Sequence, residues 1–230
     1  MRICILRYPP PSKGEGQRAG VADIIVFAVA FFLFVPAAVF AGPLEIKLID
    51  AAKAGKAAEI RELVKQGADA NARDKEGATA LMKAVVNGHA EAARELMKSG
   101  ADMNAQDAEG STALMGAAFN GHAAIARTLV EKGADVNARS ANGETALMYA
   151  SAVGGAGIAR LLLSRGADVN ARNADGTTAL MGAAAAGHAE IVRLLVDKKA
   201  DSNIKDRSGK TALDYARAMK RADIIKLLSK

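Results

Sequence analysis

Apolar residues between positions 77 and 208 fall into pairs of short runs, and each run has the three- and four-residue spacing of a helix face. In the first run of one pair, Leu81, Ala84 and Val85 share a face. A Gly-His or Gly-Gly dipeptide follows, and a second run such as "EIVRLLV" carries another apolar stripe. The pattern predicts pairs of antiparallel helices, each pair joined by a tight turn.

The pairs recur at a constant spacing along the chain. The first run begins "GATALM" at Gly77, and the same slot reads "GSTALM", "GETALM", "GTTALM" and "GKTALD" in later units. The threonines of this slot are 33 residues apart, at Thr79, Thr112, Thr145, Thr178 and Thr211. A single helix pair cannot bury its apolar faces alone, so such a period predicts units that stack on their neighbours.

These motifs resemble the ankyrin repeat, whose signature Thr-Pro-Leu-His-x-Ala recurs about every 33 residues. The resemblance covers Leu44 to Lys230 and implies an all-α fold, a solenoid of six stacked helix-turn-helix units with short β-turn or hairpin loops. The chain departs from the signature because Ala replaces Pro and Met replaces His in its inner units. We expect repeats at 44–76, 77–109, 110–142, 143–175, 176–208 and 209–230, the first degenerate and the last truncated.

The residues at the predicted helix ends have recognisable roles. Thr79 and its equivalents suit an N-cap, where the hydroxyl accepts a hydrogen bond from a free N–H of the first turn. Lys199 occupies a slot in which the other units have glycine, where a helix ends in the left-handed conformation. We therefore expect the turn at Lys199 to be strained by about 1 kcal/mol. The glycines of that slot are Gly67, Gly100, Gly133 and Gly166.

Residues 1–41 differ in composition from the repeats. Four basic residues precede the apolar stretch "IIVFAVAFFLFV", and after Pro36 the segment "AAVFA" presents small residues at Val39 and Ala41. This order is typical of a secretory signal peptide cleaved after Ala41. An uncleaved membrane anchor is the alternative, because the apolar stretch is near the lower length limit for spanning. The only cysteine, Cys4, lies upstream, so the mature chain would form no disulfide.

Charge adds a mild bias. Loss of residues 1–41 removes four of 31 basic and two of 25 acidic residues, which leaves 27 against 23. The last repeat is the most basic part, which favours either an acidic partner or membrane surface, or simply a solvated capping face. Nucleic acid is disfavoured as a partner, because single-strand binding uses stacked aromatic side chains and the mature chain keeps only Phe119, Tyr149 and Tyr215.

Three candidate chemistries are weak. The "SGKT" at residues 208–211 lacks the first glycine of a phosphate-binding loop, since position 204 is Ile. The histidines His89, His122 and His188 share one slot, but helices of adjacent repeats lie about 8–10 Å apart, too far for a shared ion. We expect these histidines to bond neighbouring backbone. The methionines of the signature slot could bind Cu(I), although filling the core is their more ordinary role. We predict no enzyme activity, no cofactor and no metal.

Residues that differ between repeats at the loop tips and on the first helices are the candidate binding residues, because the resemblance implies that partners bind the concave surface formed there. Phe119 is the one phenylalanine of the mature chain. It is either an exposed aromatic hot spot or a residue packed against the next repeat. Glycines at 116 and 182 stand where Tyr149 lies in its own repeat, and they leave room for a larger neighbour. The candidate set is Lys75, Ala78, Val86, Asn87, Ser111, Phe119, Asn120, Glu144, Val153, Thr177, Ala186 and Lys210.

The sequence thus predicts an exported, monomeric ankyrin-repeat protein that binds another protein. The signal peptide and the family resemblance indicate a periplasmic or secreted bacterial protein. The alternative is an adaptor tethered to the inner membrane through an uncleaved leader.

Overall fold

The computed structural model describes residues 42–229, and within them it contains twelve helices and no strand. The first helices of the six pairs are α2 (Pro43–Lys53), α4 (Ala80–Val86), α6 (Ala113–Phe119), α8 (Ala146–Val153), α10 (Ala179–Ala186) and α12 (Ala212–Ala218). The second helices are α3 (Ala57–Lys65), α5 (Ala90–Lys98), α7 (Ala123–Glu131), α9 (Ala156–Ser164), α11 (Ala189–Asp197) and α13 (Ala222–Leu228). The predicted all-α array of six helix pairs is confirmed.

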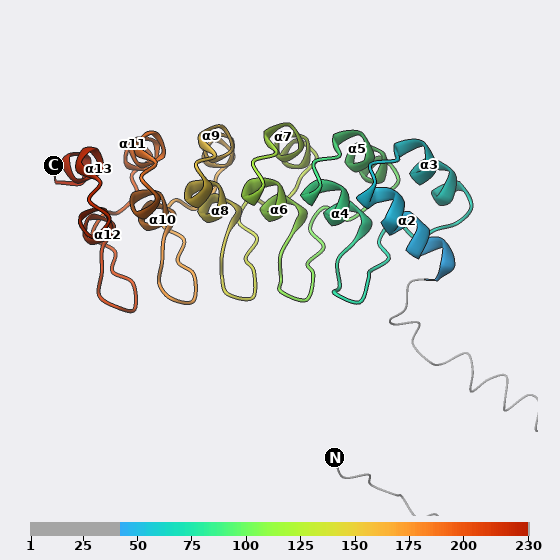
Figure 1. The fold of residues 1–230 in the computed structure, drawn as a ribbon, viewed down its shortest axis with the longest axis horizontal. Helices are drawn as coiled ribbons and strands as arrows, with labels where there is room; N and C mark the ends of the chain where they lie inside the picture. The colour runs from blue at the N-terminus through green and yellow to red at the C-terminus, as the bar shows by residue number, and fades with distance from the viewer. Residues whose placement is uncertain (1–41, 230) are drawn as a thin grey trace, which may run out of the picture. The chain divides into compact units, whose positions relative to one another are not determined.

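The helices form two rows, as Figure 1 shows. Each first helix packs on the first helices of its neighbours and on the second helix of its own pair. The loops that connect one pair to the next project from the row of first helices, away from the second row (Figure 1). We call these loops fingers; they comprise residues 66–79, 99–112, 132–145, 165–178 and 198–211. One isolated antiparallel bridge, between Arg73 and Thr79, is the only β pairing within residues 42–229.

Two columns of leucine hold the rows together. In the first helices the column consists of Leu48, Leu81, Leu114, Leu147 and Leu180, all at most 1% exposed. In the second helices it consists of Leu63, Leu96, Leu129, Leu162 and Leu195, which are also buried. Full burial of one such side chain contributes about 1.5–3 kcal/mol. Because these leucines belong to a single cluster that runs through all the repeats, the core is continuous and its stability is shared between neighbours.

The predicted helix caps are confirmed. Each signature threonine from Thr79 to Thr211 accepts a hydrogen bond from the backbone N–H three residues later, at 3.3–3.4 Å. Lys199 has φ 66° and so adopts the left-handed conformation that glycine adopts in this slot elsewhere. Lys220 has φ 54° for a related reason, because it replaces the glycine that separates the two helices of the other pairs.

Hydrogen bonds between neighbouring fingers fix their spacing. Each finger contains an Ala-Asp-x-Asn segment, which begins at residue 68, 101, 134, 167 or 200. The Asp of each segment accepts a hydrogen bond from the backbone N–H two residues later, as expected for a turn residue. The Asn of the same segment instead reaches the next finger. Asn71, Asn104, Asn137 and Asn170 each accept a bond from the backbone N–H of an Asp one repeat further on, at 2.7–2.8 Å. This ladder keeps the fingers in register.

The predicted signal peptide and its cleavage after Ala41 lie outside the described residues. Among the helices of residues 42–229, none combines the length and the apolar content needed to cross a bilayer.

Candidate partner-binding site

The fingers and the first helices together form one surface, which we call the groove face. On it, three successive first helices each carry an exposed large apolar side chain, namely Val86, Phe119 and Val153, which are 47%, 57% and 42% exposed. Phe119 is the last residue of α6 and Val153 the last of α8. An apolar strip of this kind is a candidate for contact with a partner.

Phe119 is both exposed and packed. Its ring meets the ring of Tyr149 edge to face, with the centroids 5.9 Å apart and the planes at 88°. Such a contact stabilises by about 0.5–1.5 kcal/mol and holds the ring in one orientation. Phe119 therefore packs against the next repeat, as one of the two alternatives expected, and it also presents more than half of its surface to solvent, so its role as a binding hot spot stays a prediction.

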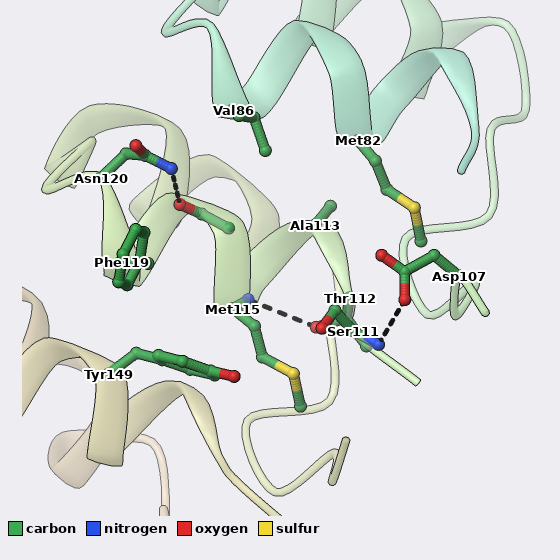
Figure 2. A pocket seen from close by; sticks show the side chains of 11 residues that line it. Met82, Val86, Asp107, Ser111, Thr112, Ala113, Met115, Phe119, Asn120 and Tyr149 are labelled. Atoms are coloured by element: carbon green, nitrogen blue, oxygen red, sulfur yellow. Dashed lines mark hydrogen bonds between the residues drawn. The ribbon is translucent and has the colours of Figure 1, made fainter. Parts of the chain in front are cut away.

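A cleft of about 370 Å³ opens next to Phe119 on the groove face. Met82 and Val86 of α4 lie along one side and Tyr149 of α8 along the other, with α6 between them (Figure 2). Gly116 lines the cleft where other repeats carry Lys83, Tyr149 and Tyr215. The absence of a side chain at position 116 leaves room for the cleft between Val86 and Tyr149. The remaining residues that line it are Asp107, Ser111, Thr112, Ala113, Met115 and Asn120.

The walls of the cleft are apolar and its finger end is acidic. The Tyr149 hydroxyl donates a hydrogen bond to Glu144 Oε2 at 2.6 Å. Burial raises the pKa of Tyr149 well above its ordinary value, and the bond to Glu144 raises it further. The negative charges of Glu109 and Asp107 act on the Tyr149 pKa in the same direction. Tyr149 therefore stays protonated, and the finger end of the cleft attracts positive charge.

Comparison with known proteins agrees with this geometry. A family model for ankyrin repeats, in three copies, matches residues 48–140, 99–173 and 157–230. The chain belongs to the ankyrin-repeat family. A search of curated proteins found no match. Ankyrin repeats are protein–protein interaction modules and are generally not enzymes, so the groove face is to be judged as a binding surface.

The structure distributes the twelve predicted binding residues over three environments. Seven are exposed, namely Lys75, Val86, Asn87, Phe119, Asn120, Val153 and Lys210. Four are partly buried, namely Ser111, Glu144, Thr177 and Ala186. Ala78 is different, because it is only 6% exposed and belongs to the core. The expectation that Ala78 lies on the binding surface is therefore wrong, because its small side chain is part of the continuous core.

The structure brings only part of the predicted set together. Val86, Ser111, Phe119 and Asn120 line the cleft, whereas Lys75 and Lys210 lie on other fingers, 66–79 and 198–211, and do not line it. Lys210 holds its ammonium 5.7 Å from the ring centroid of Tyr215, a cation–π contact within its own repeat. Asn87 and Asn120 cap helices, since each amide donates to a carbonyl four residues earlier, at 2.8 and 2.9 Å.

Seven residues of the cleft were not predicted as binding residues, namely Met82, Asp107, Thr112, Ala113, Met115, Gly116 and Tyr149. The methionines belong to the signature slot and are almost fully buried, so the sequence indicated only a core role for them. Asp107 shares its slot with Asp74 and Asp206, which both have a donor from the first helix as a partner. Asp107 differs from Asp74 and Asp206 because Gly116, at the helix position of Lys83 and Tyr215, provides no donor. A comparison of the finger position with this helix position along the sequence would have revealed the difference.

The histidines bond backbone, as predicted, and the carbonyls that they contact belong to the preceding repeat. The Nε2 atoms of His89, His122 and His188 lie 2.9, 3.2 and 3.1 Å from the backbone carbonyl oxygens of Lys53, Val86 and Ala152. Each ring covers the glycine that separates the two helices of that repeat. Over residues 42–229, no group of three or more His, Cys, Asp or Glu side chains is arranged to hold a metal ion.

Proposed function

We propose that this ankyrin-repeat protein is an exported, non-enzymatic module that binds another protein through the groove face around Phe119. The observation that carries the proposal is the exposed Phe119 ring, held in place by Tyr149 at the mouth of an apolar cleft. Aromatic side chains near the centre of an interface often supply a large part of the binding free energy.

The array is suited to binding without rearrangement. The helix caps and the ladder between fingers fix the backbone of the groove face before a partner arrives. The Phe119 ring has already lost much of its freedom through its contact with Tyr149. A preorganised surface loses less conformational entropy on binding, so more of the contact energy appears as affinity.

Export rests on the composition of residues 1–41, which has the order of a signal peptide. We propose a periplasmic or secreted protein of bacterial origin. Mass spectrometry of the mature N-terminus tests this part. A chain that begins at Gly42 supports cleavage, and peptides from before Gly42 in the mature protein favour the membrane-tethered alternative.

Phe119→Ala tests the binding face. The purified chain serves as bait in the exported fraction of the source organism, and captured proteins are identified by mass spectrometry. Loss of a hot-spot aromatic costs at least about 2 kcal/mol, so we expect the affinity for the captured partner to fall more than about tenfold. Because the main packing contact that is lost is the edge contact with Tyr149, the melting temperature should fall by only about 1–6 °C.

Val196→Ala is the matched control. Val196 is an exposed apolar residue, 38% exposed, but it lies on the second helix α11 and not on the groove face. We expect it to leave capture unchanged. Equal loss of capture in both variants would contradict the assignment of the groove face, and unfolding of Phe119→Ala would assign Phe119 to the core.

A further inference from the structure

One position of the first helices determines what each finger carboxylate contacts. It is occupied by Lys83, Gly116, Tyr149, Gly182 and Tyr215 in successive repeats. The long side chains all extend to an acidic group of their own finger. Lys83 Nζ lies 2.8 Å from Asp74 Oδ2, the Tyr149 hydroxyl donates to Glu144, and the Tyr215 hydroxyl donates to Asp206. In these three repeats a donor from the helix therefore satisfies an acid of the finger.

The repeat that contains Gly116 keeps the acid but has no donor of its own. Asp107 occupies the slot of Asp74 and uses Oδ1 in the same way, accepting bonds from the backbone N–H groups of Glu109 and Ser111 at 3.0 and 2.8 Å. Asp74 Oδ1 accepts from Glu76 and Ala78 at 3.0 and 2.9 Å. No hydrogen bond or ion pair within residues 42–229 involves the second oxygen of Asp107. Figure 2 shows that oxygen directed away from the bond to Ser111.

From these observations we propose that the cleft at Gly116 receives a lysine side chain of the partner protein, with its ammonium paired to Asp107 Oδ2. The inference rests on the proposed function and states the chemistry of the partner. Lys83 supplies the template, because repeats of the same backbone place a lysine amine at ion-pair distance from the acid of this slot.

The lining of the cleft matches both parts of a lysine. Met82, Val86 and Met115 offer apolar contact for the four-carbon stem, and lysine stems commonly lie along such surfaces. The ammonium would meet Asp107, with Glu109 nearby on the same finger and Glu144 on the next finger. The ammonium of the neighbouring Lys83 is already paired with Asp74, so its charge does not oppose the binding of a second ammonium at Asp107.

The chain contains an internal comparison for the charge. Gly182 also leaves the helix position without a side chain, but the finger residue of that repeat is Asn173. Asn173 Oδ1 accepts the same two backbone bonds, from Asp175 and Thr177 at 3.1 and 2.8 Å. An asparagine therefore maintains the finger without a charge. Asp107→Asn is accordingly a variant that removes the carboxylate and preserves the loop.

The test uses the full chain with ¹³C-labelled methionine methyl groups, titrated with a lysine residue capped at both ends. Met82 and Met115 line the cleft, and the exposed Met219 on the last repeat reports non-specific binding. We expect saturable shifts at Met82 and Met115 and none at Met219. Capped norleucine has the same stem without the amine and should bind at least about tenfold more weakly.

Two variants decide between a lysine site and a plain apolar cleft. Asp107→Asn should weaken the lysine probe at least about tenfold, to the level of norleucine. Gly116→Lys should abolish the shifts at Met82 and Met115, because the new lysine occupies the cleft itself, as Lys83 occupies this position in the repeat before. The substitution fits sterically, since the Val86 methyl group 3.1 Å from the new Cβ belongs to an exposed side chain that is able to shift. Equal binding of norleucine, equal binding by Asp107→Asn, or no shift at Met82 and Met115 would each overturn the inference.

Failure of this inference is distinguishable from failure of the proposed function. Capture of a partner that depends on Phe119, together with a silent lysine probe, would remove only the lysine assignment. A bound probe without any capture through Phe119 would instead contradict the proposed function.

Discussion

One junction of the array lacks a contact that its neighbours have, and restoring it should stabilise the protein. His89, His122 and His188 begin second helices and bond a carbonyl of the preceding repeat. The equivalent residue of α9 is Gly155, so the backbone carbonyl of Phe119 has no such donor in residues 42–229. Gly155→His should supply it.

The structure has room for the new ring. Gly155 has φ −75° and ψ 61°, close to the φ −84° and ψ 79° of His89, so the backbone already suits histidine. A Cβ at position 155 would meet its nearest neighbour, the Ala150 carbonyl oxygen, at an ordinary 3.4 Å. Gly121, over which the ring would lie, has nothing within 4 Å of a Cβ placed there, whereas the equivalent Gly88 is covered by His122.

Two terms set the magnitude. A net hydrogen bond contributes about 0.5–1.5 kcal/mol, and replacing glycine where the backbone is compatible contributes about 0.4–1 kcal/mol through the unfolded chain. The free energy of unfolding should therefore rise by about 1–2.5 kcal/mol. For a chain of this size, that raises the melting temperature by roughly 2–10 °C.

Urea unfolding followed by circular dichroism measures this change, and Gly155→Ala is the matched control. Alanine gains the backbone contribution without the imidazole, so the difference between the two variants isolates the ring. If Gly155→His is no more stable than Gly155→Ala, the bond from each histidine to the preceding repeat contributes nothing, and the reasoning is refuted.

Three further predictions concern single residues of the array. The Ser151 hydroxyl is buried without a hydrogen-bond partner in the described chain, and Ala118 fills the same slot one repeat earlier, so Ser151→Ala should raise the free energy of unfolding by about 1 kcal/mol; a loss in urea unfolding would show that the hydroxyl is satisfied. Ala146 is the first residue of α8, where proline is tolerated, so Ala146→Pro should raise it by about 0.4–1 kcal/mol, and a lower melting temperature would contradict this placement. Hydrogen bonds lower the pKa of Asp206 from 3.8 to about 2, and the bond from the Tyr215 hydroxyl has the largest effect, ahead of those from Lys210 and Ser208. The Tyr215–Asp206 pair therefore stabilises the fold above pH 3.8, and this contribution is lost as the pH falls toward 2. As the pH is lowered from about 5 to about 2, the melting temperature should fall less steeply in Tyr215→Phe than in the wild type. Identical slopes in the two proteins would show that this hydrogen bond contributes nothing to stability.

The sequence was sufficient for features that repeat. The helix pairs, the threonine caps and the left-handed turn at Lys199 follow from local chemistry at a constant register, and all are present. These features need only neighbouring residues for their explanation, so a single repeat predicts the others.

Features that depend on residues from more than one repeat were harder to predict. Ala78 was placed on the surface because it lies in a loop, but the finger folds over it. The cleft requires Gly116 on one helix, Val86 on the helix before and Tyr149 on the helix after, and no local pattern contains all three. The histidine contacts likewise span 36 residues, so the sequence indicated backbone bonding but not which carbonyl accepts it.

Photo-crosslinking in living cells tests the central claim most directly, because it locates the binding surface even when the partner is unidentified. A photoreactive amino acid is placed at Asn120, beside the cleft, or at Arg127, exposed on the second helix α7. Recognition through the groove face predicts a defined crosslinked protein from position 120 that Phe119→Ala removes, and none from position 127. Crosslinks to the same protein from position 127 but not from position 120 would contradict it.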